Sequence, residues 1–289
     1  MFFDENVVLD VRLKLLNEYV DFFVIVESTF NHKGEQRNLK FDINKFKEFK
    51  HKIIYLTSDK LPKNLEPLLK NDSENKKELK YIFNAVKREN YQRNFISKGL
   101  KLADKNDIIL ISDLDEIPFL KNINIKNIKE KIIIFEQIMT YYKFNLGMPN
   151  FIWHGTKACK KKNLLSPQWL RNVKAKKYPL FRLDILLNKK KFNNVRFIKN
   201  GGWHFSNIKE AEEIEHKLKS YLHHREFELS SIDLNQIKKT IRDKRPIYDL
   251  TVDQRKDKIG SDIKLLKIND DELPNYIIKN KDKFANWLE

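Results

Sequence analysis

Residues 108–118 read Ile-Ile-Leu-Ile-Ser-Asp-Leu-Asp-Glu-Ile-Pro, an apolar run that leads directly into three carboxylates. The apolar run predicts a short buried strand, and in an extended segment Asp113 and Asp115 point to the same side. Oxygen ligands suit Mg²⁺ or Mn²⁺, and such an ion usually keeps positions free for substrate phosphates. The segment therefore predicts a metal site for a phosphorylated ligand, with Glu116 contacting the substrate or orienting a ligand. Capping of a helix N-terminus is the alternative role for Asp113 or Asp115.

Strands and helices alternate along the chain before this motif. Residues 22–26 and 52–56 are continuous β-prone runs, and residues 73–103 have the periodicity of a long amphipathic helix. The alternation predicts an α/β fold of Rossmann-like type, with a mostly parallel central sheet flanked by helices. Ligands of such sheets bind beyond the carboxyl ends of the strands, where Glu27 and Asp113 are found. Glu27 either binds a base or sugar hydroxyl there or caps a loop.

The pattern changes after the acidic motif, where several strands are followed by helices. We expect a catalytic domain at residues 1–230 and a helical C-terminal extension at residues 231–289 that packs on it. The elements expected after the motif are strands at 132–135, 139–146, 151–159 and 192–198, a short helix opened by Ser166 and Pro167, and helices at 235–244 and 275–288.

The composition is that of a folded protein with a single thiol. The chain has 289 residues, of which 41% are hydrophobic. No apolar stretch approaches the roughly 18–20 residues that a membrane-spanning helix needs, and the acidic start MFFDEN does not match a signal peptide. Cys159 is the only cysteine, which excludes disulfides within the chain and favours a cytoplasmic location. Its expected role is that of a small buried hydrophobic side chain.

The formal net charge of +17 suggests an anionic partner or a compositional bias towards lysine. Proteins that bind single-stranded nucleic acid combine basic with aromatic residues. The lysine runs at 160–162, 176–177 and 189–191 have no aromatic residues between the lysines. An anionic glycan or a lipid head group is therefore favoured over nucleic acid. Peripheral contact with an anionic membrane surface follows as an expectation.

Two other positions are candidates for the site. His204 follows two glycines in GGWHFS, and it either ligates a metal, contacts phosphate or is a structural histidine beside Trp203. Arg93 lies four residues after Glu89 on the predicted long helix, which is the spacing of an ordinary helix ion pair. Arg93 would also be able to reach a phosphate with two hydrogen bonds.

Several familiar motifs are absent. His223, His224 and Glu226 have no standard zinc spacing, so a solvated helix face is the favoured interpretation. The chain contains no GxGxxG, no GxxxxGK[ST] and no GxSxG. The marks of Rossmann cofactor binding, P-loop hydrolysis and α/β-hydrolase chemistry are thus missing.

An ordered set of short segments resembles glycosyltransferase family 17. The resemblance covers roughly residues 2–230 and implies a GT-A-like fold, a nucleotide-sugar donor such as a UDP-sugar, Mn²⁺ or Mg²⁺, and inversion at the anomeric carbon. It also leads us to expect a further short strand upstream of Met1. The segments that carry it are FVIVES at 23–28, the Gly34 loop with Leu39 and Phe41, the Tyr91–Arg93 element, ISDLDEIP at 111–118 and GWHFS at 202–206.

The resemblance also implies roles for individual residues. Asp113 and Asp115 correspond to the metal and diphosphate residues, with His204 as a further metal ligand. The residues that would line the donor pocket are Glu27, Ser28, Arg93, Glu116, Trp203 and His204.

The expected reaction is direct displacement, in which an acceptor hydroxyl attacks the anomeric carbon of a nucleotide-activated sugar. The acceptor would be a glycan or a lipid-linked glycan, and the transferred sugar GlcNAc or another hexose. Glu116 is the nearest candidate for the general base, with Glu136 and Glu226 as weaker ones. Two alternatives remain open: a DNA-modifying glycosyltransferase of phage type, and a carbohydrate- or nucleotide-binding module without catalysis.

Overall fold

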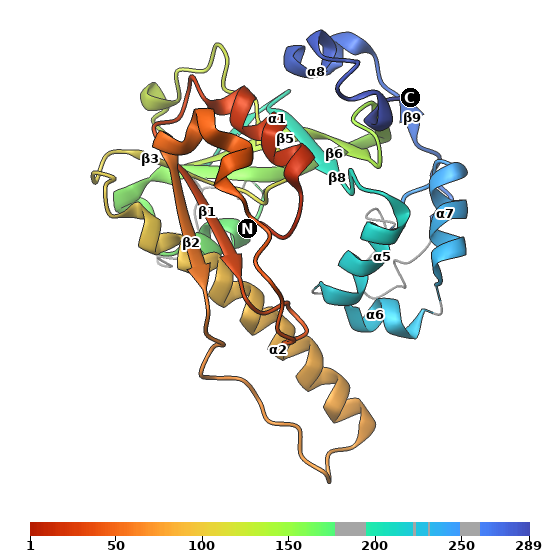
Figure 1. Ribbon diagram of the computed structural model, residues 1–289. Helices are drawn as coiled ribbons and strands as arrows, with labels where there is room; N and C mark the ends of the chain where they lie inside the picture. Colours follow the sequence, from red (N-terminus) through yellow and green to blue (C-terminus); the bar gives the residue numbers. More distant parts are fainter. Residues whose placement is uncertain (177–194, 222–223, 231, 249–260) are drawn as a thin grey trace.

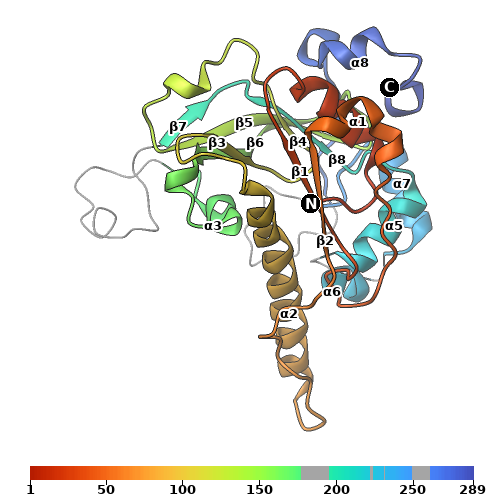
Figure 2. The ribbon, with the colours of Figure 1, turned by 60° about the vertical axis from the view of Figure 1, so that its left-hand side comes forward.

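The computed structural model describes residues 1–176, 195–221, 224–230, 232–248 and 261–289, and Figures 1 and 2 show its ribbon from two sides. A two-stranded sheet with helix α1 lies against a larger sheet, and helices α5, α6 and α7 stand beside that larger sheet (Figure 1). The helices are α1 (Asn6–Leu16), α2 (Glu74–Phe95), α3 (Pro167–Asn172), α5 (Ala211–Ser220), α6 (His224–Leu229), α7 (Leu234–Arg242) and α8 (Asn275–Lys279). The strands are β1 (Phe23–Ser28), β2 (Ile53–Ser58), β3 (Ile108–Ile111), β4 (Glu116–Pro118), β5 (Ile132–Tyr141), β6 (Leu146–Lys160), β7 (Val195–Ile198), β8 (Gly202–Ser206) and β9 (Leu266–Lys267).

The N-terminal elements agree with the sequence prediction. Strands β1 and β2 pair in parallel, with Phe23 opposite Ile53 and Ser28 opposite Ser58. Parallel strands need a crossover between them, which the segment with the 3₁₀ turns of Ile43–Lys52 provides here. The helix predicted at 73–103 is α2, which ends at Phe95 and continues as the 3₁₀ segment Ile96–Leu100. The α/β class is therefore confirmed.

The prediction of a mostly parallel central sheet is wrong. The main sheet has the order β3-β6-β5-β8-β4, with β7 beside β5 and β9 beside β6. Four of its described pairings are antiparallel, and only β5 with β7 and β5 with β8 run parallel. The prediction rests on the alternation of strands and helices and on continuous apolar runs, and burial of such runs does not by itself fix strand direction.

The bounds of strand β5 also differ from the prediction. The runs 132–135 and 139–146 were predicted as two strands, but residues Ile132–Tyr141 form one strand with a register shift where it passes from Ile134 to Glu136. Polar Glu136 and Gln137 interrupt the apolar pattern without ending the strand. The chain turns at Tyr142, whose φ of 63° is in the left-handed region, and β6 runs back to Lys160.

The C-terminal part is docked on the rest of the chain. Helix α8 contacts α1, and β9 pairs with β6 opposite Leu146 and Gly147. The predicted helix 275–288 is much shorter, because α8 ends at Lys279. Phe284 nevertheless belongs to the main hydrophobic core, with 1% of its surface exposed. The domain boundary at residue 230 remains a prediction.

The described residues contain no helix that is both long and apolar enough to span a membrane. The longest helix, α2, extends away from the body of the molecule at its N-terminal end (Figure 2). Its other end reaches Arg93, next to the acidic motif. Helix α2 therefore runs from the candidate site to an end that projects from the body of the molecule.

A cavity of about 520 Å³ separates β1 from β3. Val24 and Ile25 of β1 line one side of the cavity, and Ile109 and Leu110 of β3 line another. Among the described strands, β1 pairs only with β2, and β3 pairs only with β6. The facing edges of the two sheets are thus not joined by a strand ladder.

Candidate functional site

The acidic motif is a tight connection between β3 and β4, and Arg12 of helix α1 binds its backbone. Arg12 of α1 donates to the carbonyl oxygen of Glu116 at 2.7 Å and to Ser112 Oγ at 2.9 Å. Longer contacts of the same guanidinium reach the carbonyls of Asp113 and Leu114. Burial lowers the pKa of Arg12 to about 10, although the motif carboxylates act against the shift. Arg12 therefore fixes the backbone that presents the carboxylates.

Asp113 is held between two arginines. Its Oδ1 accepts from Arg93 Nη2 at 2.9 Å, and its Oδ2 accepts from Arg171 Nη2 at 3.0 Å. Burial alone would raise the pKa of Asp113, but the two guanidinium groups outweigh it and hold this pKa well below the usual value. Asp113 is therefore ionised, and its charge is shared between Arg93 of α2 and Arg171 of α3.

Asp115 lies next to His204 rather than between arginines. Pairing of β4 with β8 places Glu116 opposite His204, and Phe205 N donates to Asp115 O at 2.9 Å. His204 Nε2 then lies 3.5 Å from Asp115 Oδ2, and both side chains are largely buried. Burial opposes ionisation of Asp115, but His204 lowers its pKa overall. Nδ1 of His204 is buried and has no hydrogen-bond partner among the described residues.

These contacts decide how a divalent metal would fit. In the part of the chain that the structure describes, no three His, Cys, Asp or Glu side chains come close enough to form a metal cluster. Both oxygens of Asp113 already bond arginines, which leaves Asp115 and His204 as the available donors. One carboxylate and one imidazole suit Mn²⁺ or Mg²⁺ when phosphate oxygens and water supply the other ligands. The residues thus fit a site that a phosphorylated substrate would complete.

Glu116 is at the centre of a buried network. Its side chain is fully buried, with Oε1 accepting from Trp153 Nε1 at 2.6 Å and from Arg171 Nη2 at 2.7 Å. Its Oε2 accepts from the backbone N–H of Asp113 at 3.0 Å. Because both oxygens are bonded and hidden from solvent, Glu116 has no free face towards a substrate.

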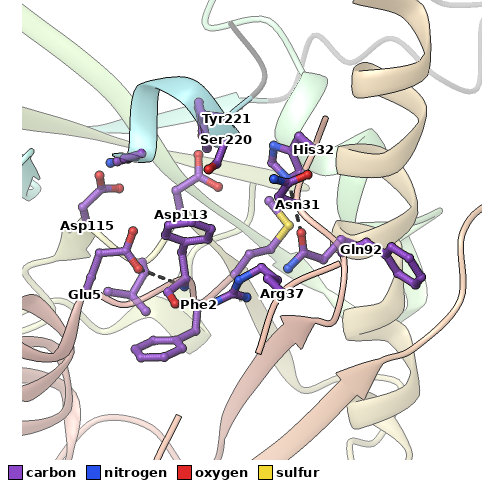
Figure 3. A pocket seen from close by; sticks show the side chains of 15 residues that line it. Phe2, Glu5, Asn31, His32, Arg37, Gln92, Asp113, Asp115, Ser220 and Tyr221 are labelled. Carbon is purple, nitrogen blue, oxygen red and sulfur yellow. Dashed lines mark hydrogen bonds between the residues drawn. The ribbon is translucent and has the colours of Figure 1, made fainter. Parts of the chain in front are cut away.

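Two cavities meet at the acidic motif. The smaller one, of about 70 Å³, lies on the β1 side and is lined by Asn31, His32 and Gln92; Figure 3 shows these side chains around Asp113 and Asp115. The larger one, of about 430 Å³, lies on the side of β6, α3 and β8. Four residues line both cavities: Asp113, Asp115, Lys217 and Tyr221. A ligand larger than either cavity would therefore pass over the two aspartates.

The larger cavity combines aromatic rings with charged groups. Trp153 and His204 lie with ring centroids 4.8 Å apart, and the guanidinium of Arg171 is 5.9 Å from the centre of the Trp153 ring. The other residues that line it include Glu89, Arg93, Met139, Tyr141, Gln168, Asn172, Asn207, Leu218 and Tyr248. Aromatic and polar side chains together are the usual lining of a site for a small polar ligand.

Of the residues predicted for the donor pocket, four lie outside both linings: Glu27, Ser28, Glu116 and Trp203. Glu27 is fully buried and accepts from Arg37, Tyr55 and two backbone N–H groups, so it organises the loop after β1. Ser28 Oγ accepts from Phe30 N in the same loop. Trp203 donates to Glu272 O at 2.7 Å and packs in the main core. Arg93 and His204, in contrast, line the larger cavity.

The remaining candidates are away from the motif or not described. Glu136 is 3.8 Å from His154 and lines neither cavity. His224 is buried, and its Nδ1 lies 2.8 Å from Tyr221 O. His223 and the side chain of Glu226 lie outside the described residues.

Sequence reasoning missed Arg171, Trp153 and Lys217. Arg171 follows the predicted Ser166–Pro167 helix start, where Ser166 Oγ caps the helix by accepting from Trp169 N. That cap placed the helix correctly, but no local pattern shows that its last turn lies against residues almost 60 positions earlier. These residues are brought together by long-range packing alone.

Comparison with known proteins agrees with the resemblance seen in the sequence. The family model described as Glycosyltransferase family 17 matches residues 1–164. Beta-1,4-mannosyl-glycoprotein 4-beta-N-acetylglucosaminyltransferases of Homo sapiens and Rattus norvegicus are each 32% identical over 118 residues, which is 38% of this chain and 19% of each relative. The Mus musculus protein of the same name is 31% identical over the same length. The alignment thus spans less than a fifth of these relatives, and no solved structure was found to match.

Proposed function

Because the chain belongs to glycosyltransferase family 17, we propose that it is an enzyme that transfers a sugar from a nucleotide-diphosphate donor to a glycan or lipid-linked glycan. The single observation that carries the proposal is the position of Asp113 and Asp115 where the two cavities meet. A nucleotide sugar is elongated, with its diphosphate between nucleoside and sugar. That shape corresponds to two adjoining cavities with a charged centre.

The residues of the chain have separate tasks in the proposed reaction. Asp115 and His204 would hold a divalent ion, which would supply positive charge to the departing diphosphate. Arg93 and Arg171 keep Asp113 ionised and fixed next to that position. The larger cavity, with Trp153 on one wall, would hold the acceptor hydroxyl against the anomeric carbon and exclude water.

The acceptor hydroxyl attacks the anomeric carbon as the bond to the diphosphate breaks, so the configuration inverts. UDP leaves with the electron pair of that bond, and the hydroxyl proton passes to a carboxylate that lines the cavity. UDP-GlcNAc is the proposed donor, because the aligned relatives are named as N-acetylglucosaminyltransferases. A GT-A-like arrangement is supported by the parallel β1–β2 pair and by the acidic motif directly after β3. The buried network of Glu116 does not support its role as general base; we propose that it positions Arg171 and Asp113 instead.

Release of UDP from UDP-GlcNAc and other nucleotide sugars tests this proposal. The purified chain should release UDP with Mn²⁺ present and lose that activity in EDTA. Asp115→Ala should abolish release while the melting temperature stays near that of the parent, and the exposed Asp262→Ala is a matched control. Full activity in EDTA would remove the metal from the proposal, and no release from any nucleotide sugar would reject the transferase.

We also propose that the enzyme acts in the cytoplasm, with peripheral contact to an anionic membrane surface. The support is the net charge of +17 and the unpaired thiol of Cys159. Fractionation of cells that express the chain, followed by a salt wash of the membrane fraction, tests both statements.

A further inference from the structure

We propose that Lys217 binds the diphosphate of the donor substrate, and this inference rests on the proposed function. Lys217 was not a candidate in the sequence. It comes from α5, whereas the two arginines come from α2 and α3, and it lines both cavities together with Asp113, Asp115 and Tyr221. A cation at this point lies where the nucleoside and sugar parts of a donor would be joined.

Helix α5 fixes Lys217 firmly. A reciprocal capping box between Glu210 and Glu213 closes the helix start. Ile214 and Leu218 are buried and belong to the core cluster beneath the helix. Lys217 lies three residues after Ile214 and therefore on the same face, at its border with the cavities.

The two arginines of the site are already paired with carboxylates. Arg93 Nη2 bonds Glu89 at 2.8 Å and Asp113 at 2.9 Å. Arg171 Nη2 bonds Asp113 at 3.0 Å and Glu116 at 2.7 Å. A diphosphate that used either guanidinium would compete with buried carboxylates for it, and breaking such pairs is costly.

Lys217 differs from these arginines in its partners. Its Nζ donates to a neutral amide oxygen, Asn207 Oδ1, at 3.2 Å, and lies 5.7 Å from the centre of the Tyr221 ring. Within the described ranges, no carboxylate is at ion-pair distance from this ammonium, although its charge contributes to the lowered pKa of Asp115. An incoming diphosphate would thus gain Lys217 without displacing a carboxylate. An ammonium group is a well-suited point charge for phosphate oxygens.

Neutralising Asp115 is the other role that Lys217 would be able to have. The two roles differ in what they predict for ligand binding. If Lys217 only neutralises the charge of Asp115, its removal changes the stability of the folded protein and leaves the affinity for UDP unchanged. If it binds the diphosphate, its removal weakens UDP specifically and has no effect on uridine, which has no phosphate.

Calorimetric titration of UDP and of uridine, with and without Mn²⁺, separates these outcomes. We expect Lys217→Met to weaken UDP binding by about tenfold or more, in the range of a lost hydrogen bond to a charged group. Lys217→Arg should retain most of the affinity, because it keeps the charge. Lys219→Met is the matched control: this lysine is on the same helix, its side chain is 56% exposed, and it pairs with Glu215.

The inference is overturned if Lys217→Met binds UDP as tightly as the parent, or if UDP and uridine weaken equally. Melting temperatures of all variants confirm that the comparison is between folded proteins, and Lys217→Gln, which also removes the charge and should weaken UDP binding equally, gives a second test should the methionine variant unfold. If the parent itself binds neither UDP nor a nucleotide sugar, the proposed function fails as well. Failure of Lys217 alone leaves UDP binding by the parent intact.

Discussion

At the scale of single residues, the site is built from carboxylates that have different partners. Asp113 is bonded to two arginines, Asp115 is next to His204, and Glu116 is buried in a network with Trp153. The sequence identified all three carboxylates because they follow an apolar strand. It gave Asp113 and Asp115 a metal role and Glu116 that of a base, but it did not show their partners, which come from α2, α3, β6 and β8.

Replacement of Glu116 by glutamine should destabilise the fold. The change removes the charge that pairs with buried Arg171, and breaking a buried pair usually costs about 3–5 kcal/mol. Urea unfolding of Glu116→Gln measures this loss, and Glu48→Gln, whose side chain is 55% exposed, should change stability by less than about 1 kcal/mol. A variant that is as stable as the parent but slower in transfer, with a lost acidic limb in its pH–rate profile, would restore Glu116 as general base.

Cys159 should not react with thiol reagents in the folded protein. Its side chain is 1% exposed, and burial raises its pKa to about 12. The thiolate is the reactive form, so at pH 8 the native chain should bind less than one tenth of a molar equivalent of Ellman's reagent within minutes. Complete reaction is expected in guanidinium chloride. Rapid labelling of the native protein would contradict the buried position of this residue.

At the scale of elements, strand β6 explains why Glu116 and Trp153 meet. Gly155 on this strand leaves room for them: a Cβ atom there would lie 2.0 Å from Gln137 Oε1 and 2.9 Å from Cδ of Glu116. The sequence predicted a strand at this position, but it did not explain why the residue is a glycine. The reason is a close approach of three side chains from different elements, which a local pattern does not contain.

Substitution of Gly155 by alanine should therefore disturb both stability and the site. Overpacking of this kind typically costs about 1–3 kcal/mol, and the displaced atoms belong to the Glu116 network. Thermal unfolding and UDP titration of Gly155→Ala test the two effects together. Ile152→Ala on the same strand, where the side chain is 57% exposed, should leave both values nearly unchanged.

At the scale of the whole molecule, the sequence predicted which segments form strands and helices better than how the strands pair. The strands at 23–28, 53–58 and 108–111 agree with prediction because each is a short apolar run bounded by polar residues. The mixed order of the main sheet was not predictable, because β5 pairs with β8 across about sixty residues. The cavities at the acidic motif depend on this strand order, so the sequence did not predict them either.

The cavity between β1 and β3 has a consequence for the exchange of backbone amide hydrogens with solvent deuterium. Val26 O accepts from Phe2 N and so points away from β2, and Val24, two residues earlier, faces the same side. The Val24 amide therefore opens into the cavity, whereas that of Ile25 faces the β2 ladder. We expect Val24 to exchange at least tenfold faster than Ile25. Equal protection of the two amides would show that the edge of β1 is closed in solution.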